Sequence, residues 1–197
     1  MPNNAWQQTI YLQSGSPETE NRSVQTAVGG INTSPGYIGQ LGSRFIVKDP
    51  SDSKKSKGYQ LVQLDSVMAT LPYSGAVAFW TNRATYLVTT SVATAGRGNV
   101  AGIFRVAPVA ADITAQNLVC IQIKGPCENV NYISGVTSAP DTTGKFVIPS
   151  ATDGQADCLA AGTAATYPKI GEAIGATSVV GGLTVGPVQV TLADDNV

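Results

Sequence analysis

Residues 59–125 form a nearly unbroken series of strand patterns, and this series limits the folds open to the chain. Within it, YLVTT (86–90) and VCIQI (119–123) place apolar or β-branched residues at strand spacing. Turn-forming glycines separate the runs: Gly75, Gly96, Gly98, Gly102 and Gly125. Strand runs joined by glycine turns predict an all-β fold, either a small β-barrel or a β-sandwich.

Alternating runs and turn residues together place the individual strands. From Tyr59 onward they predict strands near 59–65, 76–81, 85–90, 99–105, 117–124, 129–134, 145–148, 169–174 and 187–192. Upstream, residues 45–47 (FIV) also indicate a strand. For residues 157–165 (DCLAAGTAA) we expect a turn or a single helical turn, because Gly162 interrupts the segment.

Residues 99–125 have a counterpart in residues 168–193. Each segment begins with a strand that contains glycine, crosses a loop of small residues and returns as an alternating strand. Alternation with a period of two means that one face of each strand is buried. We expect two related hairpins that pack their apolar faces together into one small barrel or sandwich; a chance resemblance is the alternative.

The composition changes near residue 58. Residues 1–58 are rich in Asn, Gln, Ser, Thr and Gly, with scattered large apolar residues. We expect residues 1–58 to form an extended N-terminal arm that orders on a neighbouring surface, and residues 59–197 to form the β-domain. The alternative is that the first segment contributes ordinary strands with long loops. The arm's candidate partner-contact residues are Trp6, Ile10, Tyr11, Leu12, Tyr37 and Ile38.

Charged residues are scarce, and this bears on the partners of the protein. They make up 13% of the chain, against about a quarter in typical globular domains. A weakly hydrated surface favours burial in an assembly, and a neutral monomer is the alternative. With a net charge of −1, no global field attracts nucleic acid or an anionic membrane. We therefore predict neither as a partner.

The N-terminus lacks the basic region and apolar run of a secretory signal, and no apolar stretch reaches the length of a membrane span. We expect synthesis in the cytoplasm, where cysteines stay reduced. The three cysteines are Cys120, Cys127 and Cys158. A disulfide between Cys120 and Cys127, across Gly125 and Pro126, is the alternative.

Catalytic groups are hard to find in the sequence. There is no histidine, which excludes Ser-His-Asp and Cys-His catalysis, and the cysteines lack C-x-x-C spacing. Residues 96–101 (GRGNVA) match a dinucleotide fingerprint formally, but a strand rather than a helix is expected to follow, so a hairpin turn is the better interpretation. Asp153 and Asp157 are interpreted as turn residues rather than calcium ligands. We predict no enzyme activity, no cofactor and no metal.

Seven short motifs, taken in order, resemble those of tailed-bacteriophage capsid decoration proteins, also called head-stabilising or cement proteins. They are 60–65 (QLVQLD), 75–80 (GAVAFW), 86–89 (YLVT), 100–104 (VAGIF), 120–125 (CIQIKG), 170–175 (IGEAIG) and 188–192 (VQVTL). The resemblance spans residues 59–193. It implies a virion protein on the capsid exterior, with no catalytic residues to carry over.

Function and partners follow from the same resemblance. It implies a homotrimer that binds the outer surface of an assembled phage head and clamps neighbouring major capsid subunits. The alternative function is a carbohydrate- or receptor-binding β-module on a virion or cell surface. That function needs an exposed aromatic platform, for which the candidates are Tyr73, Trp80 and Tyr86.

Overall fold

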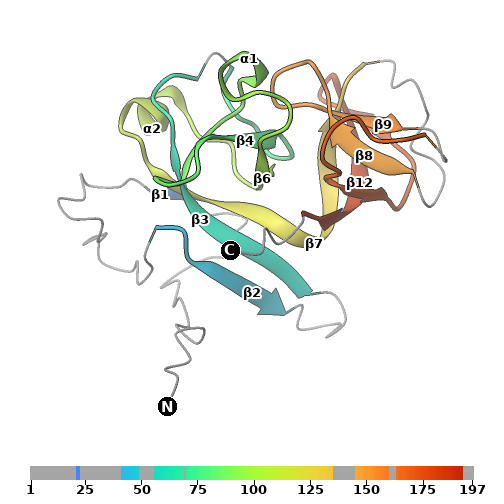
Figure 1. The fold of residues 1–197 in the computed structure, drawn as a ribbon, viewed down its shortest axis with the longest axis horizontal. Helices are drawn as coiled ribbons and strands as arrows, with labels where there is room; N and C mark the ends of the chain where they lie inside the picture. The colour runs from blue at the N-terminus through green and yellow to red at the C-terminus, as the bar shows by residue number, and fades with distance from the viewer. Residues whose placement is uncertain are drawn as a thin grey trace.

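The predicted all-β class is confirmed by a computed structural model. The structure describes residues 21–22, 41–48, 56–68, 70–134, 145–159 and 163–192. Strands make up 49% and helices 7%, and the fold contains a closed five-stranded β-barrel with further strands. Figure 1 shows two lobes, green on the left and orange on the right, with the long yellow strand β7 running between them.

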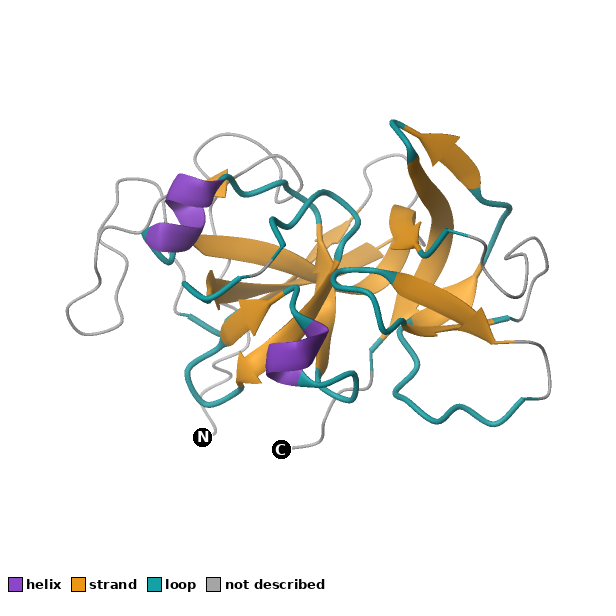
Figure 2. Cartoon of the chain, turned by 90° about the horizontal axis from the view of Figure 1, so that it is seen from above, coloured by secondary structure: helices purple, strands orange, loops and turns teal. Residues whose placement is uncertain are grey.

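All the described strands belong to one sheet. The strands are β1 (Asn21–Arg22), β2 (Arg44–Lys48), β3 (Ser56–Leu64), β4 (Val77–Asn82), β5 (Leu87–Thr89), β6 (Val100–Phe104), β7 (Leu118–Tyr132), β8 (Phe146–Pro149), β9 (Ala156–Leu159), β10 (Gly171–Ala173), β11 (Ser178–Val180) and β12 (Leu183–Thr191). The two short helices are α1 (Val92–Ala95) and α2 (Ala110–Thr114), drawn in purple in Figure 2.

The first ring of strands is the closed barrel, made of β3, β5, β4, β6 and the first part of β7. Antiparallel pairings join β3 to β7, β7 to β6, β6 to β4 and β4 to β5. A parallel pairing of β5 with β3 closes the ring. Its core contains Val62, Leu64, Ala76, Ala78, Val88, Ala101, Phe104, Val106, Ile113, Val119 and Ile121.

A second ring of pairings uses the rest of β7. Antiparallel pairings join β7 to β12, β12 to β10, β10 to β8 and β8 to β9. A parallel bridge between Tyr132 of β7 and Ala156 of β9 closes this ring. Its core also includes Val77, Phe79 and Ile103, which belong to strands of the first ring. The two rings therefore share a strand, and strands of the first ring contribute to the core of the second.

β7 changes direction between the rings, at Gly125. This residue has a φ of +91°, and a Cβ there would collide with the backbone oxygen of Ser56 in β3, so only glycine fits without strain. The buried amide of Gln122 donates from Nε2 to the carbonyl oxygens of Lys124, Gly125 and Pro126, at 3.2, 3.1 and 2.9 Å. These bonds satisfy carbonyl groups around the bend.

An ion-pair network spans the same region. Glu128 of β7 lies 3.2 Å from Nζ of Lys57 in β3 and 3.3 Å from Nη2 of Arg105, which follows β6. Pairs of this kind each contribute on the order of 0–1 kcal/mol where one partner is exposed, so they support the bend rather than create it.

Most predicted strands are confirmed, with three corrections. The strands expected at 117–124 and 129–134 are one continuous strand, β7, because the chain bends at Gly125 without leaving the sheet. Residues 157–159, expected to turn, belong to β9, where pairing with β8 overrides the weak strand propensity of the local sequence. β11 and both helices were not predicted.

The predicted counterpart of residues 99–125 in residues 168–193 also has a structural basis. β6 pairs antiparallel with β7, and β10 pairs antiparallel with β12. The expectation that both hairpins close one barrel is wrong, however, because each pair belongs to a different ring.

Some residues of the predicted N-terminal arm take part in the sheet. β2 pairs with β3, whose first residues are Ser56 and Lys57, and Asn21 and Arg22 of β1 pair with Val119 and Leu118 of β7. The rest of residues 1–40 and residues 49–55 lie outside the described residues. The division of the chain at residue 58 stays a prediction.

Replacing Gly125 with Ala tests the account of the bend. The variant is expected to lose about 2 kcal/mol or more of unfolding free energy, because Ala is strained at this φ and its Cβ collides with the β3 backbone. Chemical denaturation measures the loss. Gly98→Ala is the matched control, since a Cβ at Gly98 meets nothing within 4 Å, and its change should stay within about 0.5 kcal/mol. Equal effects of the two substitutions would contradict the account.

Candidate interaction surface

The residues predicted to contact a partner all lie outside the described residues. They are Trp6, Ile10, Tyr11, Leu12, Tyr37 and Ile38. Their role therefore stays a prediction. The described strands offer a second candidate surface, at the two ends of the sheet.

The described sheet has two ends, β2 and β11. Among the described strands, β2 pairs with β3 alone and β11 pairs with β12 alone. Ile46 of β2 is 66% exposed, and in β11 Val179 is 73% and Val180 60% exposed. Both ends of the sheet thus present large β-branched side chains to solvent.

A tight turn holds β11 in place. Val180 pairs directly with Leu183, which leaves Gly181 and Gly182 as a two-residue loop. Their φ angles are +57° and +81°, the left-handed values that the tightest hairpin turns require and that glycine adopts without strain. No charged residue occurs in residues 173–192, so the hairpin that ends in β11 is uncharged throughout.

An edge strand of this kind can bind an extended segment of a partner. Its outward backbone N–H and C=O groups supply the hydrogen bonds, and its alternating side chains supply contact and register. Natural edge strands often carry charges that block such pairing. β11 carries none, which makes it the stronger candidate of the two ends.

The aromatic candidates for a carbohydrate platform are half-buried. Tyr73 and Trp80 pack against the core of the first ring. Trp80 meets Tyr86 edge to face, with ring centroids 6.2 Å apart. The Tyr86 ring also occupies the space where a Cβ of Gly42 would lie. These rings are committed to packing, so the geometry does not favour carbohydrate binding.

The carboxylates of Asp153 and Asp157 accept hydrogen bonds from backbone N–H groups. Asp153 accepts a hydrogen bond from the Val92 backbone N–H, at 2.8 Å, at the start of α1. Asp157 accepts one from the backbone N–H of Cys158, at 2.7 Å. The interpretation as a turn residue is confirmed for Asp153, whereas it is wrong for Asp157, which lies within β9. In the part of the chain that the structure describes, no three His, Cys, Asp or Glu residues come together as a metal site would require.

The glycine motif at 96–101 forms a turn, but the predicted hairpin is wrong, because β4 lies between β5 and β6 in the sheet and the two do not pair with each other. Gly96 ends α1 with a φ of +80°, and its carbonyl accepts a hydrogen bond from the Asn99 backbone N–H at 3.1 Å. The strand β6 begins at Val100, so no helix follows the motif. The arrangement that would direct a helix N-terminus at a pyrophosphate is not formed here.

All three cysteines are buried thiols, and no disulfide joins any two of them. Cys120 packs with Tyr59 and Leu61, whereas Cys127 and Cys158 lie in the core of the second ring. The alternative of a disulfide between Cys120 and Cys127 is wrong, because the two side chains belong to different core clusters.

Burial also controls how the thiols ionise. It raises the pKa of Cys127, although Nη1 of Arg105 donates a hydrogen bond to the Cys127 sulfur at 2.8 Å. It raises the pKa of Cys158 to about 11 and raises the pKa of Tyr132, which lies in the same core. These groups are therefore neutral around neutral pH.

For this reason the fold should lose stability as the pH becomes alkaline. The pKa of Cys158 rises from an ordinary value of 9.0 to about 11, so its stabilising contribution is complete below pH 9 and is lost as the pH rises through 11. Thermal midpoints measured in reductant across this window should fall. They should fall less steeply for Cys158→Ala, which removes one titrating thiol. Parallel profiles for the variant and the native chain would contradict the prediction.

Comparison with protein-family models, with curated proteins and with solved structures gave no match for this chain. The helices within the described residues are all too short or too polar to cross a bilayer.

Proposed function

We propose that this protein is a structural component of a virion, which binds the outer surface of an assembled phage capsid and stabilises it. The observation that carries the proposal is the sheet that ends in two exposed edges, β2 and β11. An all-β body with two such edges can contact two neighbours. The motif resemblance in residues 59–193 indicates that these neighbours are major capsid subunits.

A ligand of this type stabilises a shell by mass action. If it binds the assembled lattice and not the free subunits, binding shifts the equilibrium toward the lattice. A modest interface at each edge suffices, because a molecule that engages two subunits gains effective concentration for the second contact. Strand addition at β2 and β11 supplies the main-chain hydrogen bonds of these contacts.

The proposal includes the position and the assembly of the protein. It lies on the capsid exterior after synthesis in the host cytoplasm, and it associates with copies of itself as a homotrimer. The N-terminal residues Trp6, Ile10, Tyr11, Leu12, Tyr37 and Ile38 anchor the arm on adjacent subunits. Neither nucleic acid nor a membrane is a partner in this function.

Binding to purified capsids tests the proposal. The protein should co-sediment with expanded capsids and raise the temperature at which they disrupt. The double variant Val179→Lys/Val180→Lys places like charges on the β11 edge and should weaken binding at least about tenfold, because lysines on an edge strand oppose strand addition. Its own thermal midpoint should stay close to the native value, since both side chains are exposed.

The control for this experiment is Val67→Lys. Val67 is 67% exposed, like the β11 valines, but lies in the connection between β3 and β4. This variant should bind capsids as the native chain does. Failure of the native protein to bind either expanded or unexpanded capsids would refute the proposed function, and equal losses for both variants would refute the role of β11.

A further inference from the structure

The two rings of strands have the same topology. Numbered along the chain, the strands of the first ring are β3, β4, β5, β6 and β7, and those of the second are β7, β8, β9, β10 and β12. In both rings the pairing order is first, fifth, fourth, second, third and back to first. In both, the pairing of the first strand with the third is parallel and the other four pairings are antiparallel.

The register of the pairings agrees as well. Four residue pairs of the first ring each have a counterpart in the second ring. Leu64–Val88 corresponds to Tyr132–Ala156, Trp80–Val88 to Pro149–Ala156, Ala78–Gly102 to Val147–Gly171, and Ile103–Gln122 to Glu172–Gln189. The separation along the chain is nearly constant. It is 68 positions from Leu64 to Tyr132, 69 from Ala78 to Val147 and 67 from Gln122 to Gln189.

The inward side chains correspond in the same register. In the first ring the core includes Val62, Leu64, Ala78, Val88, Ala101, Phe104 and Ile121. At the matching positions, the core of the second ring includes Val130, Tyr132, Val147, Ala156, Ile170, Ala173 and Val188. Apolar residues therefore face inward at all seven matched positions.

A shared glycine requirement supports the match. A Cβ on Gly102 would lie 2.9 Å from the backbone oxygen of Gln122, and a Cβ on Gly171 would collide with the backbone oxygen of Gln189. Glycine thus allows the fourth strand to approach the fifth closely in each ring, against the backbone of a glutamine flanked by β-branched residues.

The outer faces of the matched strands differ. In the first ring Val77, Val100 and Ile103 face outward from the barrel and are buried in the core of the second ring. Their counterparts in the second ring are Phe146, Lys169 and Glu172. Phe146 is half-buried and the two charged residues are exposed.

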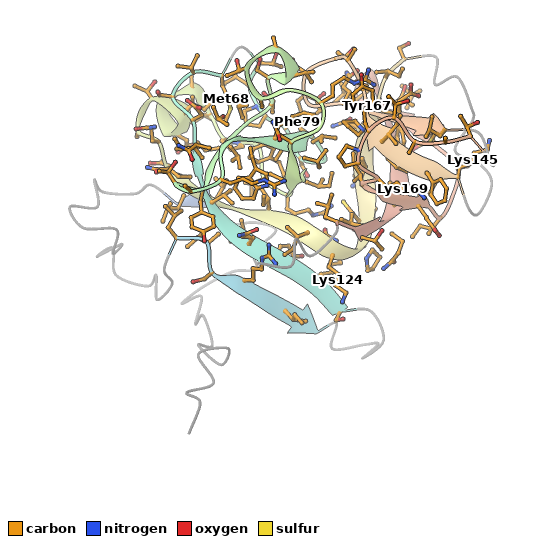
Figure 3. All side chains as sticks on the ribbon, in the orientation of Figure 1. Met68, Phe79, Lys124, Lys145, Tyr167 and Lys169 are labelled. Carbon is orange, nitrogen blue, oxygen red and sulfur yellow. The ribbon has the colours of Figure 1, made fainter. Side chains whose placement is uncertain are left out.

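Lys169 partly covers the aromatic residue of this outer face. Its Nζ lies 3.1 Å from the centroid of the Phe146 ring. Figure 3 shows Phe79 toward the middle of the molecule and Lys169 in the orange lobe. At two of the three matched positions, the residue is therefore apolar where the face contacts a following unit and charged where no described unit follows.

We infer that residues 56–192 are two copies of one five-stranded unit that share β7, and that Lys169 and Glu172 end the array. Repeat proteins need a polar outer face on the terminal unit, because an apolar one would recruit further copies. Burying a lysine and a glutamate at such an interface is unfavourable. The outer face of β8 and β10 therefore excludes another copy of this chain.

Exchanging the matched residues in the full-length chain tests the inference. Val100→Lys/Ile103→Glu gives the first unit the terminal residues and should lower the thermal midpoint strongly or prevent folding. Lys169→Val/Glu172→Ile gives the second unit the internal residues and should keep the native fold by circular dichroism. By light scattering, this variant should form larger species as its concentration rises.

Lys124→Val/Thr191→Ile is the matched control, since it also converts an exposed lysine and an exposed polar residue to β-branched residues; Lys124 and Thr191 pair with each other across β7 and β12. It should leave the oligomeric state unchanged. A native midpoint for Val100→Lys/Ile103→Glu would overturn the inference. So would unfolding of Lys169→Val/Glu172→Ile, or a mass for that variant equal to the mass of the control.

Discussion

The structure depends on one strand that serves two rings. The first part of β7 pairs with β3 and β6, and its second part pairs with β12 and β9. The strand can do both because the backbone bends at Gly125, in a conformation and at a distance from β3 that a side chain would prevent. The Gln122 amide stabilises the bend by donating hydrogen bonds to the carbonyl oxygens of Lys124, Gly125 and Pro126. Without this bend the second ring would have no first strand.

Sharing β7 also joins the two cores. Val77 and Phe79 lie on the outer side of the barrel and complete the core of the second ring. Close packing transmits a change in one ring to the other, so we expect the rings to behave as a single rigid body. In such a body the two open ends of the sheet, β2 and β11, keep a fixed separation. A fixed separation suits the proposed clamp, because two contacts on a regular lattice must match its spacing.

The sequence was sufficient to predict the fold class and most strands, because strands such as VCIQI place β-branched residues at alternate positions. The sequence was not sufficient to predict that β7 continues through the bend at Gly125. Gly125 and Pro126 resemble a turn locally, and only the pairing with β3 and β12 shows that the chain continues in the sheet. The open edges could not be predicted either, since an edge is defined by the strands that pair beside it. Val179 and Val180 resemble core residues in sequence, yet they are exposed.

Native-state hydrogen exchange tests most directly whether the two rings are one cooperative body. The slowest amides of β3 in the first ring and of β12 in the second should exchange through the same global opening, with equal free energies that respond equally to denaturant. Protection of β12 that is lost at a lower free energy, while β3 stays protected, would contradict the account. That result would mean that the second ring opens alone and that the shared strand does not couple the two.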